Sequence, residues 1–161
     1  MKYQIRKLLP NEYPILEEFL YSAIFQKDEN NLIPKEIIYT EPTLQIFYKD
    51  FGMKNDFCLV VEYEKEIIGA AWVRLLNGVP KGFGNIDDTT PELAISINPN
   101  FRSKGIGKVL LKELLVSLKE NNYTQISLAV QKENYALKLY QEVGFKIIKE
   151  VDEEYIMLCL L

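Results

Sequence analysis

Glu92-Leu-Ala-Ile-Ser-Ile-Asn-Pro-Asn-Phe-Arg-Ser-Lys-Gly-Ile-Gly-Lys108 is the stretch that decides the fold. Its first part, Leu93 to Ile97, is a short apolar run rich in β-branched residues, which suits a buried strand better than so short a helix. Asn98-Pro99-Asn100 ends that strand, because proline cannot donate to a sheet and Asn-Pro favours a turn. A helix then follows, since apolar residues recur at helical spacing: Ile106, Val109, Leu110, Leu114 and Leu118.

The loop between this strand and this helix has the features of an anion site. The first N–H groups of a helix lack intrahelical partners, and the macrodipole adds about half a positive charge there. Gly105 and Gly107 let a ligand approach the backbone closely, because neither has a Cβ. Arg102, Lys104 and Lys108 add full charges. The stretch therefore predicts a phosphate-ester ligand, in particular a pyrophosphate.

Two other phosphate-binding motifs do not fit this loop. A P-loop requires Gly-Lys-Ser/Thr, and here Gly107-Lys108 is followed by Val109. A dinucleotide fingerprint would need a third glycine at position 110, where the chain has leucine. Arg-x-x-Gly-x-Gly after a strand and a proline turn is a more specific pattern than a bare pair of glycines.

A second motif, Asn134-x5-Tyr140-x3-Gly144-Phe145, follows the next predicted strand. Together the two motifs resemble the GNAT superfamily of N-acetyltransferases, and the resemblance extends over residues 57–150. It implies that the glycine loop grips the pyrophosphate of acetyl-coenzyme A, and that backbone amides of a splayed strand hold its pantetheine arm. The cofactor-binding residues implied are Ile95, Ser96, Ile97, Arg102, Ser103, Lys104, Gly105, Ile106, Gly107, Lys108, Asn134 and Tyr140.

The chemistry that the resemblance implies is attack of an amine on an acetyl thioester. Tyr140, with an ordinary pKa of about 10, is suited to protonate the leaving thiolate. The chain has no histidine, so a carboxylate, a tyrosinate or a water relay must take the proton of the amine. Glu92 lies near where several GNAT enzymes carry a glutamate base, and Asp87 and Asp88 are weaker alternatives.

Each of these residues also has a purely structural interpretation. Tyr140 shares a helical face with apolar residues and could pack in the core. Asn134 could serve only as a helix cap, and Glu92 could be a solvated carboxylate at the end of a strand. Arg74 could be exposed or could line the acceptor pocket, and Trp72 could belong to the core or to the pocket wall.

Composition limits the class of protein. A chain of 161 residues with 48% hydrophobic residues predicts one domain, residues 1–161, with a sizeable core. A net charge of −4 disfavours a nucleic-acid partner, and no apolar run or leader predicts a membrane association, so we expect a cytoplasmic protein. Cys58 and Cys159 lie in apolar runs and are expected to be buried thiols, and no metal-binding pattern exists.

The pattern along the chain predicts an α/β (α+β mixed) fold in the order β-αα-βββ-α-β-α-ββ. The resemblance makes it a GNAT-like fold, with a mixed, mostly antiparallel sheet of six or seven strands, a central parallel pair and helices on both faces. The strands are expected at 3–8, 57–63, 67–76, 93–97, 125–130, 145–150 and 155–160, and the helices at 12–25, 33–39, 43–51, 106–120 and 135–143.

The function expected is transfer of an acetyl group from acetyl-CoA to a primary amine of a small molecule or a protein. Direct transfer in a ternary complex is expected, because neither cysteine lies in a nucleophile setting. Two alternatives stay open: a non-catalytic acyl-CoA-binding or sensing domain, and a nucleotide-binding module. A homodimer is possible, since related enzymes are often dimers.

Overall fold

Seven strands form one mixed sheet in the computed structural model, which describes residues 1–161. The strand order is β1-β2-β3-β4-β5-β7-β6, and only the central pair β4 and β5 is parallel. The predicted fold class is therefore confirmed. The strands are β1 Gln4–Lys7, β2 Phe57–Tyr63, β3 Glu66–Arg74, β4 Glu92–Ile97, β5 Gln125–Gln131, β6 Lys146–Val151 and β7 Glu154–Leu160. The helices are η1 Pro10–Ile15, α1 Leu16–Ala23, α2 Ile37–Thr40, α3 Pro42–Gln45, η2 Pro99–Phe101, α4 Ile106–Glu120 and α5 Ala136–Val143.

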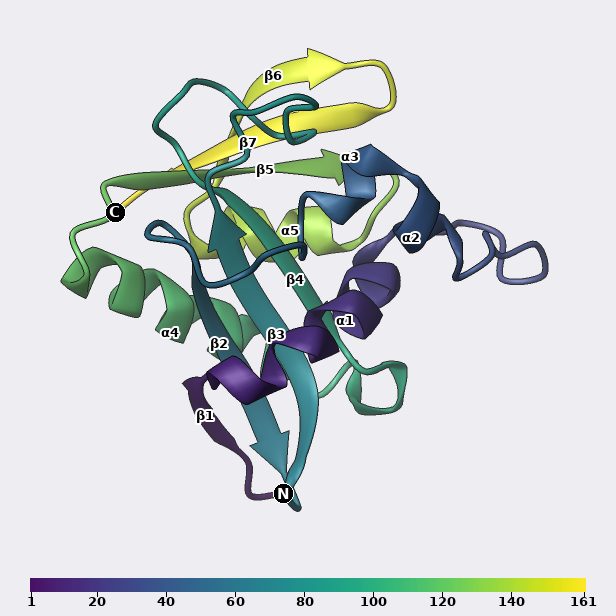
Figure 1. Ribbon diagram of the computed structural model, residues 1–161, viewed down its shortest axis with the longest axis vertical. Helices are drawn as coiled ribbons and strands as arrows, with labels where there is room; N and C mark the ends of the chain where they lie inside the picture. Colours follow the sequence, from purple (N-terminus) through teal and green to yellow (C-terminus); the bar gives the residue numbers. More distant parts are fainter.

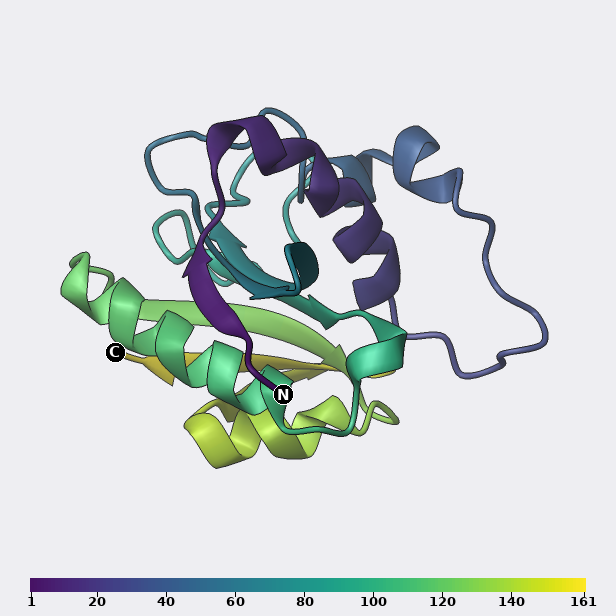
Figure 2. The ribbon, with the colours of Figure 1, turned by 90° about the horizontal axis from the view of Figure 1, so that it is seen from below.

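Helices cover both faces of the sheet (Figure 1). Seen from below, α1, α2 and α3 lie on one side of the sheet, and α4 and α5 lie on the other (Figure 2). The predicted apolar stripe of α4 faces the sheet, with Leu110, Leu114 and Leu118 fully buried, except for Val109, which is 39% exposed. Trp72 belongs to the core on the opposite face, where its indole N–H donates to the carbonyl of Phe47 at 2.9 Å.

The segment before α1 winds as a 3-10 helix rather than as the first turns of one long helix. Pro10 and Pro14 lack an N–H, so an α-helical ladder cannot run through them. The Glu12 carboxylate accepts the Leu9 N–H at 2.8 Å and pairs with Arg6 at 2.8 Å. The predicted helix over 12–25 therefore divides into η1 and α1.

A bulge lies in β3 beside the small residues Gly69, Ala70 and Ala71. Val61 pairs with Gly69 and Glu62 pairs with Ile67, so Ile68 is the extra residue. A Cβ at Gly69 would lie 2.5 Å from Cδ1 of Ile97 on the neighbouring strand. Glycine at this position lets β3 and β4 approach closely.

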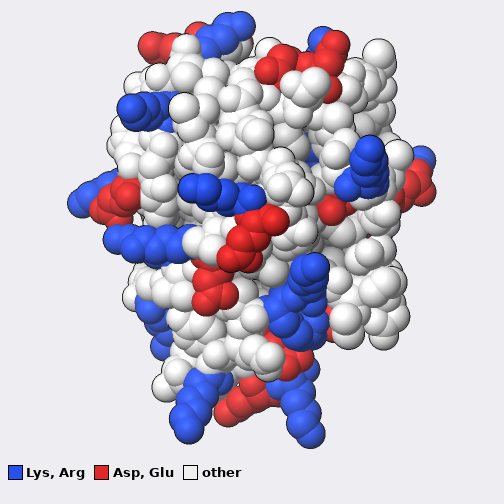
Figure 3. Space-filling model, turned by 90° about the vertical axis from the view of Figure 1, so that its left-hand side faces the viewer, with Lys and Arg blue, Asp and Glu red and all other residues white.

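The surface carries charges of both signs. On the face shown in Figure 3, lysine and arginine side chains are interspersed with aspartate and glutamate and do not gather into a patch of one sign. No helix of the protein combines the length and the apolar composition that crossing a bilayer requires.

Arg74 is a buried structural residue and lies outside the cavity described below. Its Nε pairs with Asp56 at 3.0 Å, and the two side chains are only 7% and 5% exposed. Its Nη1 donates to the carbonyls of Ile46 and Lys49 at 3.0 and 2.7 Å, and its Nη2 donates to that of Asp50 at 3.3 Å. The guanidinium thus fastens the segment after α3 to the end of β3.

We expect Arg74→Met to lower the free energy of unfolding by about 3 kcal/mol, because it leaves Asp56 buried without its partner. Urea unfolding followed by circular dichroism measures this. Lys49→Met, on an exposed side chain of the same segment, is the control and should change stability by less than about 0.5 kcal/mol. Equal effects of the two substitutions would contradict the assignment of Arg74 as a structural anchor.

Candidate active site

The two parallel strands at the centre of the sheet meet at one end and then diverge (Figure 1). Glu92 and Ser127 are their only paired residues, and the Ser127 N–H donates to the carbonyl of Pro91 at 3.0 Å. Beyond this point, residues 93–97 of β4 pair with β3 but not with β5. One backbone edge of β4 is therefore open inside the sheet.

A cavity of about 270 Å³ fills the space between the diverging strands. Its walls include residues 92–95 of β4 and residues 128–131 of β5. Asn134 and Tyr140 border it on the side of α5. The cavity therefore brings together both predicted catalytic residues, Glu92 and Tyr140, with the asparagine of the second motif.

The glycine loop lies at the C-terminal end of β4 and leads into α4. Gly105 adopts a left-handed conformation with φ +79°, and a Cβ placed there would find nothing within 4 Å. Ser103 has φ +63°. The first N–H with a partner in the helix is that of Val109, which donates to the carbonyl of Gly105 at 3.3 Å. The N–H groups of residues 106–108 are thus available to a ligand.

The basic side chains of this loop differ in what they contact. Arg102 donates from Nε to the carbonyl of Ile97 at 2.9 Å and from a terminal nitrogen to the Ser22 hydroxyl at 3.0 Å. Lys108 pairs with Glu142 at 3.2 Å, on the surface. Lys104 is exposed and makes no ion pair. Arg102 therefore ties the loop to β4 and α1, and only Lys104 has an unengaged charge.

The second motif supplies a helix cap and a free hydroxyl. Oδ1 of Asn134 accepts the N–H of Ala136 at 2.9 Å at the start of α5. The ring of Tyr140 packs edge-on against Phe145, with 5.8 Å between the centroids. No hydrogen bond within the protein uses the Tyr140 hydroxyl, and burial raises the pKa of Tyr140 to about 12. The hydroxyl is thus protonated at neutral pH.

Glu92 is buried rather than solvated, with only 3% of the residue exposed. Its Oε2 accepts the N–H of Gly84 at 2.9 Å, while its buried Oε1 has no hydrogen-bond partner. Burial is the main cause that raises the pKa of Glu92 to about 7, and the charge of Glu154 adds to it, while the Gly84 N–H opposes it. The cation opposite Glu92 on β3, Arg74, is engaged by Asp56.

A second carboxylate, Glu154, lines the same cavity from the first residue of β7. Burial and the nearby Asp152 raise the pKa of Glu154. Sequence reasoning missed it, because Asp152-Glu153-Glu154 looks like a polar hairpin turn. Only the pairing of Glu154 with Gln131, on the strand that borders the cavity, reveals its place.

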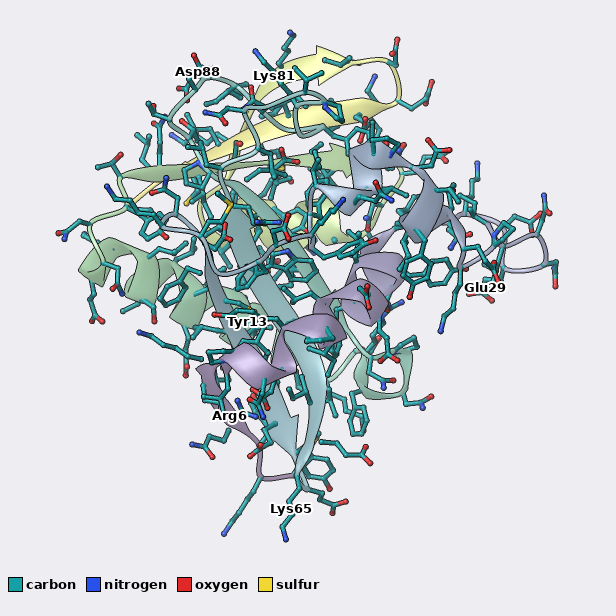
Figure 4. All side chains as sticks on the ribbon, viewed as in Figure 1. Arg6, Tyr13, Glu29, Lys65, Lys81 and Asp88 are labelled. Atoms are coloured by element: carbon teal, nitrogen blue, oxygen red, sulfur yellow. The ribbon has the colours of Figure 1, made fainter.

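The alternative bases suggested by the sequence lie outside the cavity. Asp87 accepts the N–H groups of Thr89 and Thr90 at 2.9 and 2.7 Å, so its carboxylate fixes a turn. Asp88 is exposed on the same loop, near the top of Figure 4. Glu92 is the carboxylate that the structure places next to the open edge of β4.

The open parallel pair and the glycine loop define an acetyltransferase fold. Residues 17–145 match the sequence model of the Acetyltransferase (GNAT) family, and the chain belongs to this family. The family predicted from the two motifs is therefore confirmed. The comparisons support the predicted N-acetyltransferase class of enzyme.

The chain is similar to N-acetylaspartate synthetases. It is 30% identical to that of Danio rerio over 113 residues, which are 66% of this chain and 40% of that protein. It is 33% identical to that of Xenopus tropicalis over 112 residues, which are 65% of this chain and 41% of that protein. The match thus spans about two fifths of these relatives.

Among solved structures, the fold is similar to that of the PaiA N-acetyltransferase from Thermoplasma acidophilum in complex with coenzyme A. The TM-score is 0.70 at 21% identity, with 100% of both chains covered.

The buried Glu92 predicts a stability that depends on pH. A pKa of about 7 in the folded state, against the ordinary 4.5, means that the folded state binds more protons between these values. Ionised Glu92 should therefore destabilise the fold fully above pH 7, by about 3 kcal/mol, and not below pH 4.5.

Glu92→Gln should accordingly raise the free energy of unfolding more at pH 8 than at pH 4.5, measured by urea unfolding. Glu113→Gln, at an exposed position of α4, serves as the control and should show no such difference. The same effect of Glu92→Gln at both pH values would contradict a pKa near 7.

Proposed function

We propose that this protein is an acetyl-CoA-dependent N-acetyltransferase that moves the acetyl group directly to a primary amine. One observation carries the proposal: a buried glutamate with an unpaired carboxylate oxygen and a tyrosine with a free hydroxyl line one cavity between diverging parallel strands. Acetyl-CoA supplies the thioester, whose C–S bond breaks as the amide C–N bond forms.

The residues at the cleft fit this cosubstrate. The unpaired N–H groups at the start of α4 can receive a diphosphate, and the space in front of Gly105 is open. The free edge of β4 over residues 95–97 can pair with the amides of a pantetheine arm, as in strand addition. A backbone N–H of this edge is also suited to stabilise negative charge on the thioester oxygen.

Glu92 acts as the general base. A pKa of about 7 keeps a large fraction of the carboxyl group ionised at neutral pH, while leaving it basic enough to accept a proton from an ammonium group. Its unpaired Oε1 is the atom that receives the proton. The amine thereby gains the lone pair it needs for attack.

Tyr140 acts as the general acid. Its hydroxyl is protonated at neutral pH and has no partner within the protein, so it is free to donate to the departing sulfur. The ammonium loses two protons in all. One leaves through Glu92 to solvent, and the other replaces the proton that Tyr140 gives to the thiolate.

The transfer is direct, without an acetylated enzyme. Cys58 on β2 is buried outside the cavity, and burial raises the pKa of its thiol. Cys159 on β7 is also buried, with its pKa raised by the same cause. Neither thiol borders the cavity, and a nucleophilic cysteine needs a lowered pKa.

A non-catalytic acyl-CoA-binding domain explains the cleft but not Glu92. Binding of the cosubstrate requires the glycine loop and the edge of β4, and it does not require the carboxylate of Glu92. An ionised group with an unpaired buried oxygen destabilises the fold, so its presence favours a catalytic role.

The names of the curated relatives make aspartate one candidate acceptor.

Tyr140→Phe should lower kcat about 100-fold and leave the Kd of coenzyme A within about twofold, because it removes only the proton donor. Thiol release from acetyl-CoA over a panel of amines measures the turnover. Tyr135→Phe is the matched control, since Tyr135 lies just before α5 and is 77% exposed. An unchanged kcat would remove Tyr140 as the acid, and a wild-type protein that binds coenzyme A but acetylates no amine would favour the binding domain.

Gly105→Val should raise the Kd of coenzyme A by at least about tenfold, because a side chain there would occupy the space in front of the helix N-terminus. Isothermal titration calorimetry measures this. Gly144→Ala is the control for backbone strain, since Gly144 also has positive φ, +116°, but ends α5 away from the loop. If both variants bound coenzyme A like the wild type, the loop assignment would be wrong.

A further inference from the structure

The cavity has a second side, which α1 and the following loops build across from Asn134 and Tyr140. Leu20 and Ile24 of the α1 region contribute aliphatic surface there. Phe47 and Phe83 also line it, and their rings stack with 6.2 Å between centroids and 19° between planes. This wall is apolar, and its flat aromatic pair suits an apolar group.

The only charged side chains that line the cavity are two carboxylates, Glu92 and Glu154. No lysine or arginine lines it. Two nearby lysines are engaged outside it: Lys27 pairs with Glu133 at 3.0 Å, and Lys132 pairs with Glu150. The site is therefore apolar and anionic, without a cation to receive an acid group.

We propose that the acceptor is a small primary amine with an apolar, preferentially aromatic body and no carboxylate, and that Glu154 selects it by holding its ammonium group together with Glu92. This inference rests on the proposed acetyl transfer. It assigns Glu154 a role in specificity, while Glu92 remains the base.

The unpaired Oε1 of Glu92 is the observation that points to such a ligand. A buried carboxylate oxygen without a partner is unfavourable, and an ammonium N–H of the acceptor would satisfy it. Glu154 is half-buried on the same cavity and adds a second acceptor of hydrogen bonds. The stacked Phe47 and Phe83 then receive the rest of the molecule.

An acidic acceptor such as aspartate does not suit this cavity. Its carboxylates would lose water without gaining a cation, and they would lie near two like charges. The size of the cavity, about 270 Å³, also favours a small molecule over a folded protein surface. The acceptor of this chain should therefore differ from the one that the names of its curated relatives indicate.

The test compares acceptors that differ only in the carboxylate. Wild-type protein with saturating acetyl-CoA is assayed by thiol release with phenethylamine and phenylalanine, and separately with aspartate. We expect kcat/KM for phenethylamine to exceed that for each acid by at least about 100-fold. Equal or better turnover of either acid overturns the inference but leaves the proposed function in place. If no amine gives any thiol release, both the inference and the proposed function are overturned.

Variants of Glu154 test whether this residue determines the selectivity for the acceptor. Glu154→Gln should raise KM for phenethylamine about tenfold, the effect of one lost charge-assisted hydrogen bond, with kcat and the Kd of coenzyme A nearly unchanged. Glu154→Lys should lower the ratio of kcat/KM between phenethylamine and phenylalanine about 100-fold, which a merely structural role would not do. Glu153→Gln, exposed on the same hairpin, is the control. An unchanged KM and an unchanged ratio in the two Glu154 variants would overturn the role of Glu154.

Discussion

The pairing of β4 with β5 at a single position is the constraint on which the rest of the structure depends. Two parallel strands inside a sheet normally satisfy each other's backbone groups along their length, yet here only Glu92 and Ser127 pair. The edge of β4 that is left open needs another partner. The same βαβ unit brings the N-terminus of α4 to the end of β4, so an anion site and an open strand edge arise together.

The opening also explains why an unfavourable carboxylate is tolerated at the centre of the protein. Glu92 lies at the point where the strands part, so it is buried by the fold but faces the cavity. Gly82 leaves room for it, since a Cβ there would lie 2.0 Å from Oε1. A buried carboxylate with an unpaired oxygen lowers the stability of the fold, and proteins accept such a cost at functional sites when other contacts compensate for it. The buried Arg74–Asp56 pair supports the end of β3 that lies beside Glu92.

The sequence was most informative where a motif combined with periodicity. The strand, glycine loop and helix of residues 92–120 could be predicted, because proline, glycine and apolar spacing each constrain the backbone locally. The break between η1 and α1 was less clear, since Pro14 is compatible with a helix start. Long-range placement could not be predicted: Glu154 reaches the cavity only through strand pairing, and Phe83 only through the path of a long loop. The hydrogen bonds of Arg102 to β4 and α1 could not be predicted for the same reason.

A crystal structure of the protein with acetyl-CoA tests the central claim most directly. The account predicts the diphosphate at the N–H groups of residues 106–108, the pantetheine arm along the open edge of β4, and the thioester between Glu92 and Tyr140. Acetyl-CoA bound elsewhere, or β4 and β5 paired along their whole length with the cavity closed, would contradict it.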